Sequence, residues 1–392
     1  MKSPVCLEKT DSVSEKGPLP SVFLMTNSLE TGGTERQFAA LAQALDDSLF
    51  SPSLGCLKRE GAFLSGLNGI REFSPGGSLL KWRSQRARFA LARHLRLSQV
   101  ALAHSFDFYS NLMLISAARA ARVPLVIGSQ RQLGDLLSPA KRHAQNLMFR
   151  LCHRIVCNSE AAAERLRSSG IPKSKVVVIP NGVADDFFAS PPPALPRDPG
   201  TFNVGMISRM NDRYKRHDVF LRAAARLSPR FPQVRFVLVG DGSLRGELEA
   251  LAQSLGLKDK VLFLGNRSDM PAVLAALDVN VLPSDSESLS NVILESMAAG
   301  IPSVATQVGG NAELVEHGVT GLLTRTNDPE QLSAALELFL MQPDVRAACG
   351  VRARQKAMAS YGIRKIAMRY RDLYRELLDE KGLRSSALER HA

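Results

Sequence analysis

A strand, a turn and a helix are predicted in direct succession at residues 279–300, and this unit constrains the fold more than any other stretch. The apolar run 279–282 predicts the end of a buried strand, and apolar residues recur at helical spacing after the turn. Ser288 or Ser290 is a suitable N-cap, and Gly300 is a suitable end for the helix. Strand, turn and helix in this order are typical of α/β proteins, which use them to bring backbone close to a phosphate.

Two carboxylates flank the start of this predicted helix. Glu287 precedes the helix, and Glu295 lies inside it, about 8 Å beyond the cap at roughly 1.5 Å of rise per residue. A helix N-terminus offers unpaired N–H groups and a positive dipole end, which suit a phosphate group. The two glutamates are therefore candidates to hold hydroxyl groups on either side of a diphosphate. The alternative is a capped surface helix with two solvated glutamates.

The length and composition fit two domains with full cores, since the chain has 392 residues of which 45% are hydrophobic. Residues 1–20 are polar, without the apolar core of a signal peptide, and are interpreted as a flexible tail. The five cysteines are odd in number and form no Cys-x-x-Cys. This usage favours a reducing cytosol, so we expect a cytoplasmic protein. Cys152, His153 and Cys157 lack a fourth ligand, and no metal site is expected there.

Strands and helices alternate from residue 21 onward, which predicts an α/β fold in two parts. Residues 191–200 include five prolines and are predicted to be a linker, because proline sustains neither a helix nor a central strand. The linker separates a first domain at 21–190 from a second at 201–363. Residues 364–392 predict an amphipathic helix that crosses back to the first domain, followed by a tail.

Residues 79–97 combine positive charge with apolar surface and contain no acidic residue. Trp82 and Phe89 lie among six basic residues, namely Lys81, Arg83, Arg86, Arg88, Arg93 and Arg96. A basic amphipathic helix with aromatic residues favours contact with an anionic membrane surface, here the inner leaflet of the cell membrane. The alternative is a solvated helix packed on its domain. Nucleic acid is not an expected partner, because no binding module or array of stacking aromatics accompanies the charge.

The predicted helix that ends at Gly300 and its surroundings resemble a known family. Residues 286–302 are similar to the E-x7-E motif of retaining GT-B-fold glycosyltransferases of the glycosyltransferase 4 family. Residues 28–36 resemble the family's Gly-Gly-x-Glu loop, and residues 308–313 its Gly-Gly-x-x-Glu turn. Residues 208–216 resemble its Gly-Arg-Leu…Lys segment, with serine in place of the glycine. The motifs occur in the family's order and together extend over about residues 21–380.

The resemblance implies the GT-B architecture, in which two Rossmann-like domains face each other across a cleft and present ligand loops at the carboxyl ends of their strands. It also implies transfer of a sugar from a nucleotide-sugar to a hydroxyl of a glycan or lipid-linked acceptor, with retention of anomeric configuration, in polysaccharide or glycolipid synthesis. No cofactor is expected beyond the donor, which is a substrate. The chain has no Asp-x-Asp, the nearest match being Asp285-Ser-Glu287, so positive residues are expected to replace a metal.

The resemblance also implies residue roles. Arg209 and Lys215 would stabilise the departing diphosphate, since a planar fork and a point charge both suit phosphate. Glu287 would orient the donor sugar, and Glu295 would bind the ribose diol. Further donor contacts are expected at Gly33, Gly240, Asn266, Arg267, Ser288, Leu289 and Ser290.

His104, Asp107 and Arg131 are candidate contacts to the sugar or acceptor. The family often has His-x-His-(Asp/Glu) here, and its second His commonly contacts the donor sugar. This chain has Phe106 at that position, which leaves a histidine-assisted role open. A non-catalytic GT-B partner subunit, a nucleotide-sugar 2-epimerase and a glycoside hydrolase are the alternative functions.

Overall fold

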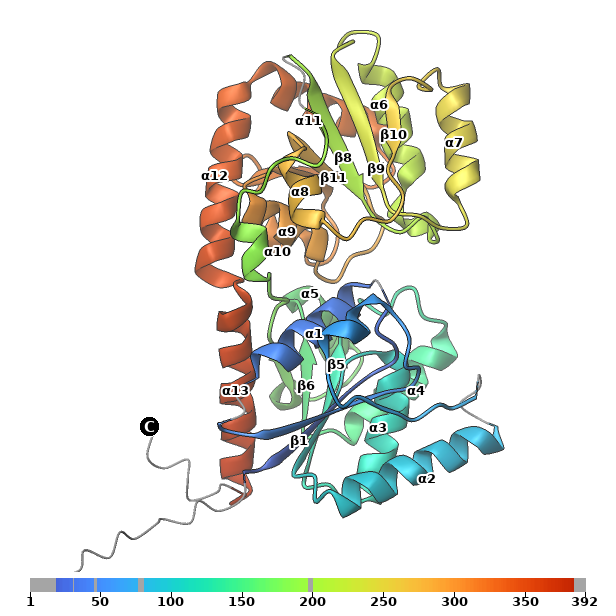
Figure 1. Cartoon of the computed structure of the whole chain (residues 1–392), viewed down its shortest axis with the longest axis vertical. Helices are drawn as coiled ribbons and strands as arrows, with labels where there is room; N and C mark the ends of the chain where they lie inside the picture. The colour runs from blue at the N-terminus through green and yellow to red at the C-terminus, as the bar shows by residue number, and fades with distance from the viewer. Residues whose placement is uncertain (1–18, 31, 46–47, 77–80, 197–199, 384–392) are drawn as a thin grey trace, which may run out of the picture.

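The computed structural model describes residues 19–30, 32–45, 48–76, 81–196 and 200–383. Two α/β units lie end to end along the long axis of the molecule, one coloured blue to green and the other mostly yellow to orange (Figure 1). Residues 1–18 of the predicted tail at 1–20, residues 79 and 80 of the basic segment, part of the predicted linker and residues 384–392 of the predicted C-terminal tail fall outside the described residues. Over the described residues, no helix is both long enough and apolar enough to cross a lipid bilayer.

The N-terminal unit contains a seven-stranded sheet whose strand pairs are all parallel, in the order β3-β2-β1-β4-β5-β6-β7. Its strands are β1 (Ser21–Thr26), β2 (Ser51–Cys56), β3 (Arg71–Glu72), β4 (Leu102–Ser105), β5 (Leu125–Gln130), β6 (Arg154–Cys157) and β7 (Val176–Val178). Its helices are α1 (Gly33–Ala44), α2 (Trp82–Leu97), α3 (Phe108–Ala120), α4 (Pro139–Arg150) and α5 (Glu160–Ser168), with short 3-10 turns η1 (Ala62–Gly66), η2 (Lys173–Lys175) and η3 (Asp185–Phe188).

The C-terminal unit contains a six-stranded parallel sheet in the order β10-β9-β8-β11-β12-β13. Its strands are β8 (Phe202–Ile207), β9 (Val234–Val239), β10 (Val261–Phe263), β11 (Val279–Leu282), β12 (Ser303–Thr306) and β13 (Gly321–Thr324). Its helices are α6 (His217–Leu227), α7 (Arg245–Ser254), α8 (Met270–Ala275), α9 (Asn291–Ala299), α10 (Asn311–Leu314), α11 (Pro329–Met341) and α12 (Pro343–Ser360), with the 3-10 turn η4 (Arg213–Lys215).

The strand order explains where a ligand can enter. Each sheet is built outward in both directions from its first strand, so the order reverses between β1 and β4 in one unit and between β8 and β11 in the other. At such a reversal the loops after the two strands diverge and leave a crevice at the carboxyl ends. The two Rossmann-like units of the predicted GT-B architecture are therefore confirmed, and their crevices lie at the boundary between them.

The last helix, α13 (Ile363–Glu380), returns to the N-terminal unit as predicted. Its apolar residues recur at helical spacing, and Tyr370, Tyr374 and Leu377 are buried in one core with Val22 and Leu24 of β1. Figure 1 shows α12 and α13 running along one side of the molecule, α12 beside the C-terminal unit and α13 beside the N-terminal unit. The helices α12 and α13 thus connect the two units.

Candidate active site

A cleft between the two units collects loops from the carboxyl ends of both sheets. Its cavity volume of about 310 Å³ lies at the lower end of the roughly 300–1,000 Å³ of small-molecule sites. Every residue predicted to act on the donor lines it, together with Arg131: Gly33, Arg209, Lys215, Gly240, Asn266, Arg267, Glu287, Ser288, Leu289, Ser290 and Glu295. Residues far apart in the sequence therefore meet on the walls of one site.

The helix α9 begins at this cleft, and its ends are as the sequence predicts. Ser290 is the N-cap, and its hydroxyl accepts a hydrogen bond from the Ile293 N–H at 3.3 Å. Gly300 ends the helix in the left-handed conformation, with φ of 76°. The preceding loop is held by Gly309, where φ is 45° and a Cβ would lie 1.8 Å from the carbonyl oxygen of Glu287. Only glycine permits that close approach, so the Gly-Gly-x-x-Glu turn at residues 308–313 packs against the backbone of the loop that precedes α9.

Lys215 and Glu287 form an ion pair in the cleft, with 2.6 Å between Nζ and Oε1. The two side chains are only 20% and 12% exposed. Burial alone lowers the pKa of Lys215, but the attraction of Glu287, supported by Tyr214, outweighs it and raises the pKa above its ordinary value. Lys215 is therefore fully charged at neutral pH. Arg209 is exposed on the same wall.

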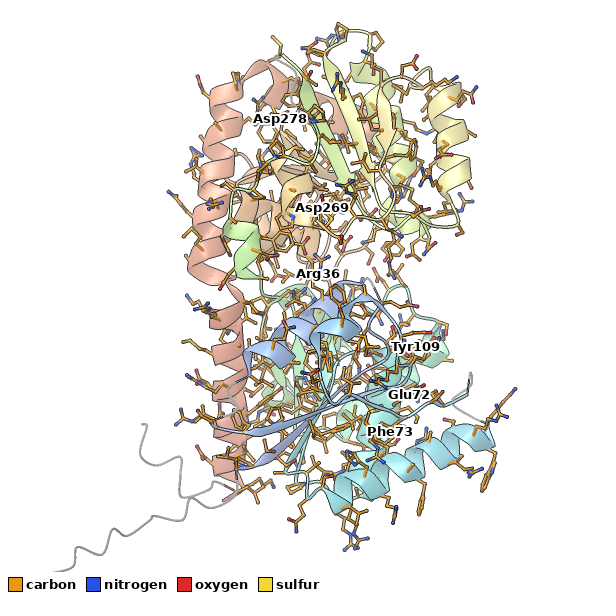
Figure 2. The ribbon with its side chains drawn as sticks, viewed as in Figure 1. Arg36, Glu72, Phe73, Tyr109, Asp269 and Asp278 are labelled. Carbon is orange, nitrogen blue, oxygen red and sulfur yellow. The ribbon has the colours of Figure 1, made fainter. Side chains whose placement is uncertain are left out.

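Glu295 is 4% exposed and pairs with Arg36, whose Nη1 donates to Oε1 of the carboxylate. Arg36 belongs to α1 of the N-terminal unit, so the pair crosses the cleft. Figure 2 shows Arg36 at the boundary between the two units. Arg36 was not predicted as a site residue, because a partner 259 positions away leaves no local pattern in the sequence.

Arg131 lines the cleft after β5, where three groups hold its guanidinium. Its Nη1 donates to Asn181 Oδ1 at 2.9 Å, and its Nη2 donates to the hydroxyl of Tyr370 on α13 at 2.7 Å. The guanidinium carbon lies 4.9 Å from the centre of the Phe106 ring. Phe106 stands where the family often has histidine. It is fully buried, and its ring makes a cation–π contact with Arg131.

The structure places His104 and Asp107, the predicted contacts to the sugar or acceptor, outside the lining of the cleft. His104 is fully buried, and its two ring nitrogens share hydrogen bonds with Tyr374 at 2.7 Å and Ser129 at 2.8 Å. Burial and the nearby Arg131 lower the pKa of His104 well below its usual range, so the ring is neutral. Asp107 caps α3, and it also accepts a hydrogen bond from the Asn27 N–H after β1. Neither residue lines the cleft, because each is occupied by the N-terminal unit itself.

Polar contacts join the two units around the cleft. Ser288 Oγ donates to Asn158 Oδ1 at 2.5 Å, and Asn181 Nδ2 donates to Asn291 Oδ1 at 2.8 Å. The Glu313 carboxylate accepts two 3.0 Å hydrogen bonds from backbone N–H groups at the start of α5. A carboxylate at a helix N-terminus is stabilised by the helix dipole. Loops of the two units therefore meet directly around the cleft.

The carboxylates near the cleft are held by cations. Glu287 is bound by Lys215 and Asp285 by Arg216, at 2.6 and 3.3 Å. Over the described residues, no group of three or more His, Cys, Asp or Glu side chains is arranged to hold a metal ion. A glycosidase needs two carboxyl groups directed at one bond, whereas here each carboxylate is engaged by a positive side chain.

Comparison with known proteins identifies the family. The model of glycosyl transferases group 1 matches residues 201–342, and that of Glycosyltransferase Family 4 matches residues 31–187. A D-inositol 3-phosphate glycosyltransferase of Nocardiopsis dassonvillei is 32% identical over 304 residues, which cover 70% of each chain. The UDP-Gal:alpha-D-GlcNAc-diphosphoundecaprenol alpha-1,3-galactosyltransferase of Escherichia coli is 27% identical over 332 residues, which cover 78% of this chain and 82% of the relative.

The fold has solved counterparts. The crystal structure of Anabaena HepE in complex with UDP superposes with a TM-score of 0.79 at 23% identity, covering 91% of this chain and all of that one. The chain belongs to the group 1, family 4 glycosyltransferases of GT-B fold. It is a transferase that uses a nucleotide-sugar, so the alternative of a glycoside hydrolase is set aside.

Proposed function

We propose that this enzyme transfers a sugar from a nucleoside diphosphate donor to a hydroxyl of a lipid-linked glycan, with retention of anomeric configuration. One observation carries the proposal: Glu287, Glu295 and the start of α9 meet Lys215 in one cleft. A charged lysine and a helix N-terminus can bind a diphosphate, and the carboxylates on both sides can accept hydrogen bonds from hydroxyl groups. The donor is thus held in one orientation along the C-terminal wall.

The reaction places growing negative charge on the leaving diphosphate. Arg209, Lys215 and the N–H groups at the start of α9 are positioned on the wall where that charge would develop. Preorganised donors of this kind stabilise a transition state more than the ground state. Lys215 is paired with Glu287 in this structure, so donor binding would exchange a carboxylate for phosphate oxygens at its ammonium group.

The two glutamates would hold the sugars of the donor. Glu287 would accept hydrogen bonds from hydroxyls of the transferred sugar and fix its anomeric carbon, and Glu295 would accept those of the ribose. The base would lie against the loop at Asn266 and Arg267, which lines the same cleft. Gly240, which lines the same cleft, has a φ of 128°, and a Cβ there would lie 2.1 Å from the carbonyl oxygen of Ser208, so only glycine lets these two loops pack together.

We also propose that the reaction needs no metal ion. Positive charge at the diphosphate position comes from Arg209 and Lys215, both on the cleft wall. The nearest match to a metal-binding Asp-x-Asp is Asp285-Ser-Glu287, and its two carboxylates point to separate cations, Arg216 and Lys215. The side chains that would hold a metal are thus already engaged.

A lipid-linked acceptor is supported by the surface of α2. Trp82 and Phe89 are 75% and 74% exposed and stand seven positions apart, which places them on one helix face. Arg86 and Arg93, four positions beyond each aromatic residue, are exposed as well. The opposite face packs into the N-terminal core through Leu91 and other apolar residues. Large aromatic side chains left in water beside arginines are typical of helices that dock on anionic lipid.

This surface lies on the N-terminal unit, the half that binds the acceptor in this family. In Figure 1, α2 forms the edge of that unit farthest from the C-terminal unit. The E. coli relative acts, by its name, on a diphosphoundecaprenol-linked sugar. Docking on the inner leaflet would bring such an acceptor to the enzyme, and each basic residue near the surface would contribute about 1 kcal/mol at low salt.

A thermal-shift panel tests the donor assignment. UDP, GDP, ADP and their sugars are added to the purified protein, and the correct nucleotide raises the melting temperature because it binds only the folded state. Uridine nucleotides are expected to give the largest shift, since the E. coli relative uses UDP-Gal by its name. If no nucleotide in the panel raises the melting temperature, the proposed donor site is wrong.

Vesicle sedimentation tests the membrane assignment. The protein should sediment with anionic vesicles, remain in the supernatant with neutral ones, and be released by salt. Changing Trp82 and Phe89 to serine, or Arg86 and Arg93 to glutamine, should release it. The matched control changes two exposed arginines of the C-terminal unit, Arg226→Gln and Arg230→Gln. If the control variant loses as much vesicle binding, the binding depends only on the net charge of the protein, which would contradict a docking role for α2.

A further inference from the structure

Arg36 reaches from the N-terminal unit to a carboxylate of the C-terminal unit. It is the fourth residue of α1, and its Nη1 donates to Oε1 of Glu295 on α9. In Figure 2 the label of Arg36 falls where the two units meet. The ion pair can therefore exist only while the two units are close together.

Two aromatic rings lie close to the guanidinium of Arg36. Its carbon lies 5.8 Å from the ring centre of Phe63 on η1 and 5.9 Å from that of Phe187 on η3. Such distances are within the range of cation–π attraction. Together with Glu295, groups from three separate elements fix the position of this side chain. A surface arginine that is merely solvated would not need this arrangement.

The pair leaves half of the carboxylate available to a ligand. Glu295 is 4% exposed, yet it lines the cleft. Arg36 binds Oε1, which leaves Oε2 as the oxygen to offer to a molecule in the cleft. A carboxylate held on one side and offered on the other accepts hydrogen bonds in a fixed direction.

The charge of Glu295 depends on Arg36. Burial raises the pKa of this carboxyl, and Asp186 on η3 raises it further. Arg36 is the group that opposes the shift, both through its charge and through its hydrogen bond. Hydrogen bonds to an ionised carboxylate are roughly twice as strong as those to a neutral group.

We propose that Arg36 is a positioning residue for the donor, which holds Glu295 ionised and oriented so that Oε2 receives the ribose hydroxyls. The inference rests on the ribose role given to Glu295 above. Because Arg36 and Glu295 belong to different units, the ribose site is complete only while the two units are in contact.

Calorimetric titration with UDP and 2′-deoxy-UDP tests the proposal, with the GDP and ADP pairs measured in parallel. The wild-type protein should bind the ribonucleotide about tenfold or more tightly than the deoxy form, as one lost charge-assisted hydrogen bond predicts. Arg36→Gln should weaken the ribonucleotide by about the same factor and bring the two affinities together. Arg36→Lys keeps the charge and should recover part of the difference.

The pH dependence of nucleotide binding gives a further test. It should not change if Arg36 serves only to hold the two units together. In the wild type, the ratio of ribonucleotide to deoxyribonucleotide affinity should stay constant over about pH 6–8, because Arg36 keeps Glu295 ionised and the titration of the phosphate is the same in both ligands. In Arg36→Gln only burial and Asp186 remain, and both raise the pKa of Glu295. The ratio in this variant should therefore be close to one at the acidic end and rise with pH. The control, Arg154→Gln, removes an exposed ion pair to Glu380 away from the cleft and should match the wild type.

The outcomes separate this inference from the function on which it rests. If Arg36→Gln keeps the wild-type preference for the ribonucleotide and that preference does not change with pH, the inference is overturned. If Arg36→Gln is unstable, the Glu295→Gln background decides: a second change at Arg36 should cause no further loss of affinity, and a full further loss would overturn the inference. If the wild type binds ribo and deoxy forms equally, the ribose role of Glu295 is wrong. If no nucleotide binds, the donor site itself is wrong.

Discussion

Lys215→Ala is expected to remove most of the activity while also destabilising the donor-free enzyme. Lys215 sits at the end of η4 with its ammonium 2.6 Å from Oε1 of Glu287. In the free enzyme the lysine neutralises a nearly buried carboxylate, and in the reaction it would neutralise the departing diphosphate. Alanine removes both interactions, so two separate measurements should respond.

The magnitudes follow from burial. Breaking a buried ion pair from one side costs about 3–5 kcal/mol, and the residual exposure of 20% and 12% in this pair lowers that to about 2–3 kcal/mol. This corresponds to a fall in Tm of roughly 5–10 °C for a domain of 150–250 residues. Loss of a preorganised charge at the leaving group should lower kcat by about 10²–10³.

The chain offers a matched control on the same turn. Arg213 pairs with Glu247 at 2.7 Å, but the two side chains are 73% and 55% exposed. Arg213→Ala should therefore change stability by less than about 1 kcal/mol and leave kcat unchanged. The double variant Lys215→Ala/Glu287→Gln should regain Tm, because no unpaired charge remains, without regaining turnover.

Scanning calorimetry gives Tm, and release of nucleoside diphosphate at saturating donor gives kcat. If Lys215→Ala keeps more than about a tenth of the wild-type kcat, the leaving-group role is refuted, whatever the change in Tm. A fall in Tm that persists in the double variant would show that the pair does not account for the stability loss.

Three further predictions concern the same cleft. Glu287→Gln should mainly lower kcat, and Glu295→Ala should mainly raise the donor KM, because the first orients the reacting sugar and the second binds the ribose; steady-state kinetics that show unchanged turnover in Glu287→Gln would remove its role. Activity should persist in EDTA, and a strict requirement for added Mg²⁺ or Mn²⁺ would contradict the metal-free proposal. Gly309→Ala should cost more than about 1 kcal/mol and lower kcat, since the new Cβ would meet the Glu287 carbonyl oxygen; a Tm and kcat equal to the wild type would show that the turn tolerates a side chain.

Much of the C-terminal wall could be predicted because its signals are local. The strand 279–282, a cap at Ser288 or Ser290 and the end at Gly300 each follow from a few neighbouring residues, and the structure has the strand, the end and the cap at Ser290. The ligand loops follow buried strands, and carboxyl ends of parallel strands meet at one edge. The resemblance to the family then predicted which residues of these loops act on the donor, and Arg209, Asn266 and Glu287 line the same cleft.

Contacts between distant residues could not be predicted in this way. His104 looks like a ligand contact by position, but Tyr374, 270 residues later, takes one of its ring nitrogens. Arg131 donates a hydrogen bond to Tyr370 on the last helix, 239 residues away. Such pairings depend on how α13 packs against the first sheet, and no spacing within either segment encodes them.

The short outer strands were also not predicted from the sequence. β2 has the sequence Ser-Pro-Ser-Leu-Gly-Cys, whose small and turn-forming residues do not give the apolar run of a central strand. β3 has two residues, and both are exposed. These strands form by pairing beside β1, whose own residues are buried. Tertiary contact therefore decides their structure, and local preference does not.

The anomeric configuration of the product tests the central claim most directly. The enzyme is supplied with the nucleotide-sugar that stabilises it best and with lipid-linked sugar acceptors in anionic vesicles, and the product is analysed by ¹H NMR at the anomeric proton. The account predicts a new glycosidic bond with the same anomeric configuration as the donor, formed together with one nucleoside diphosphate. A product of inverted configuration, or donor cleaved without transfer to any acceptor, would contradict it.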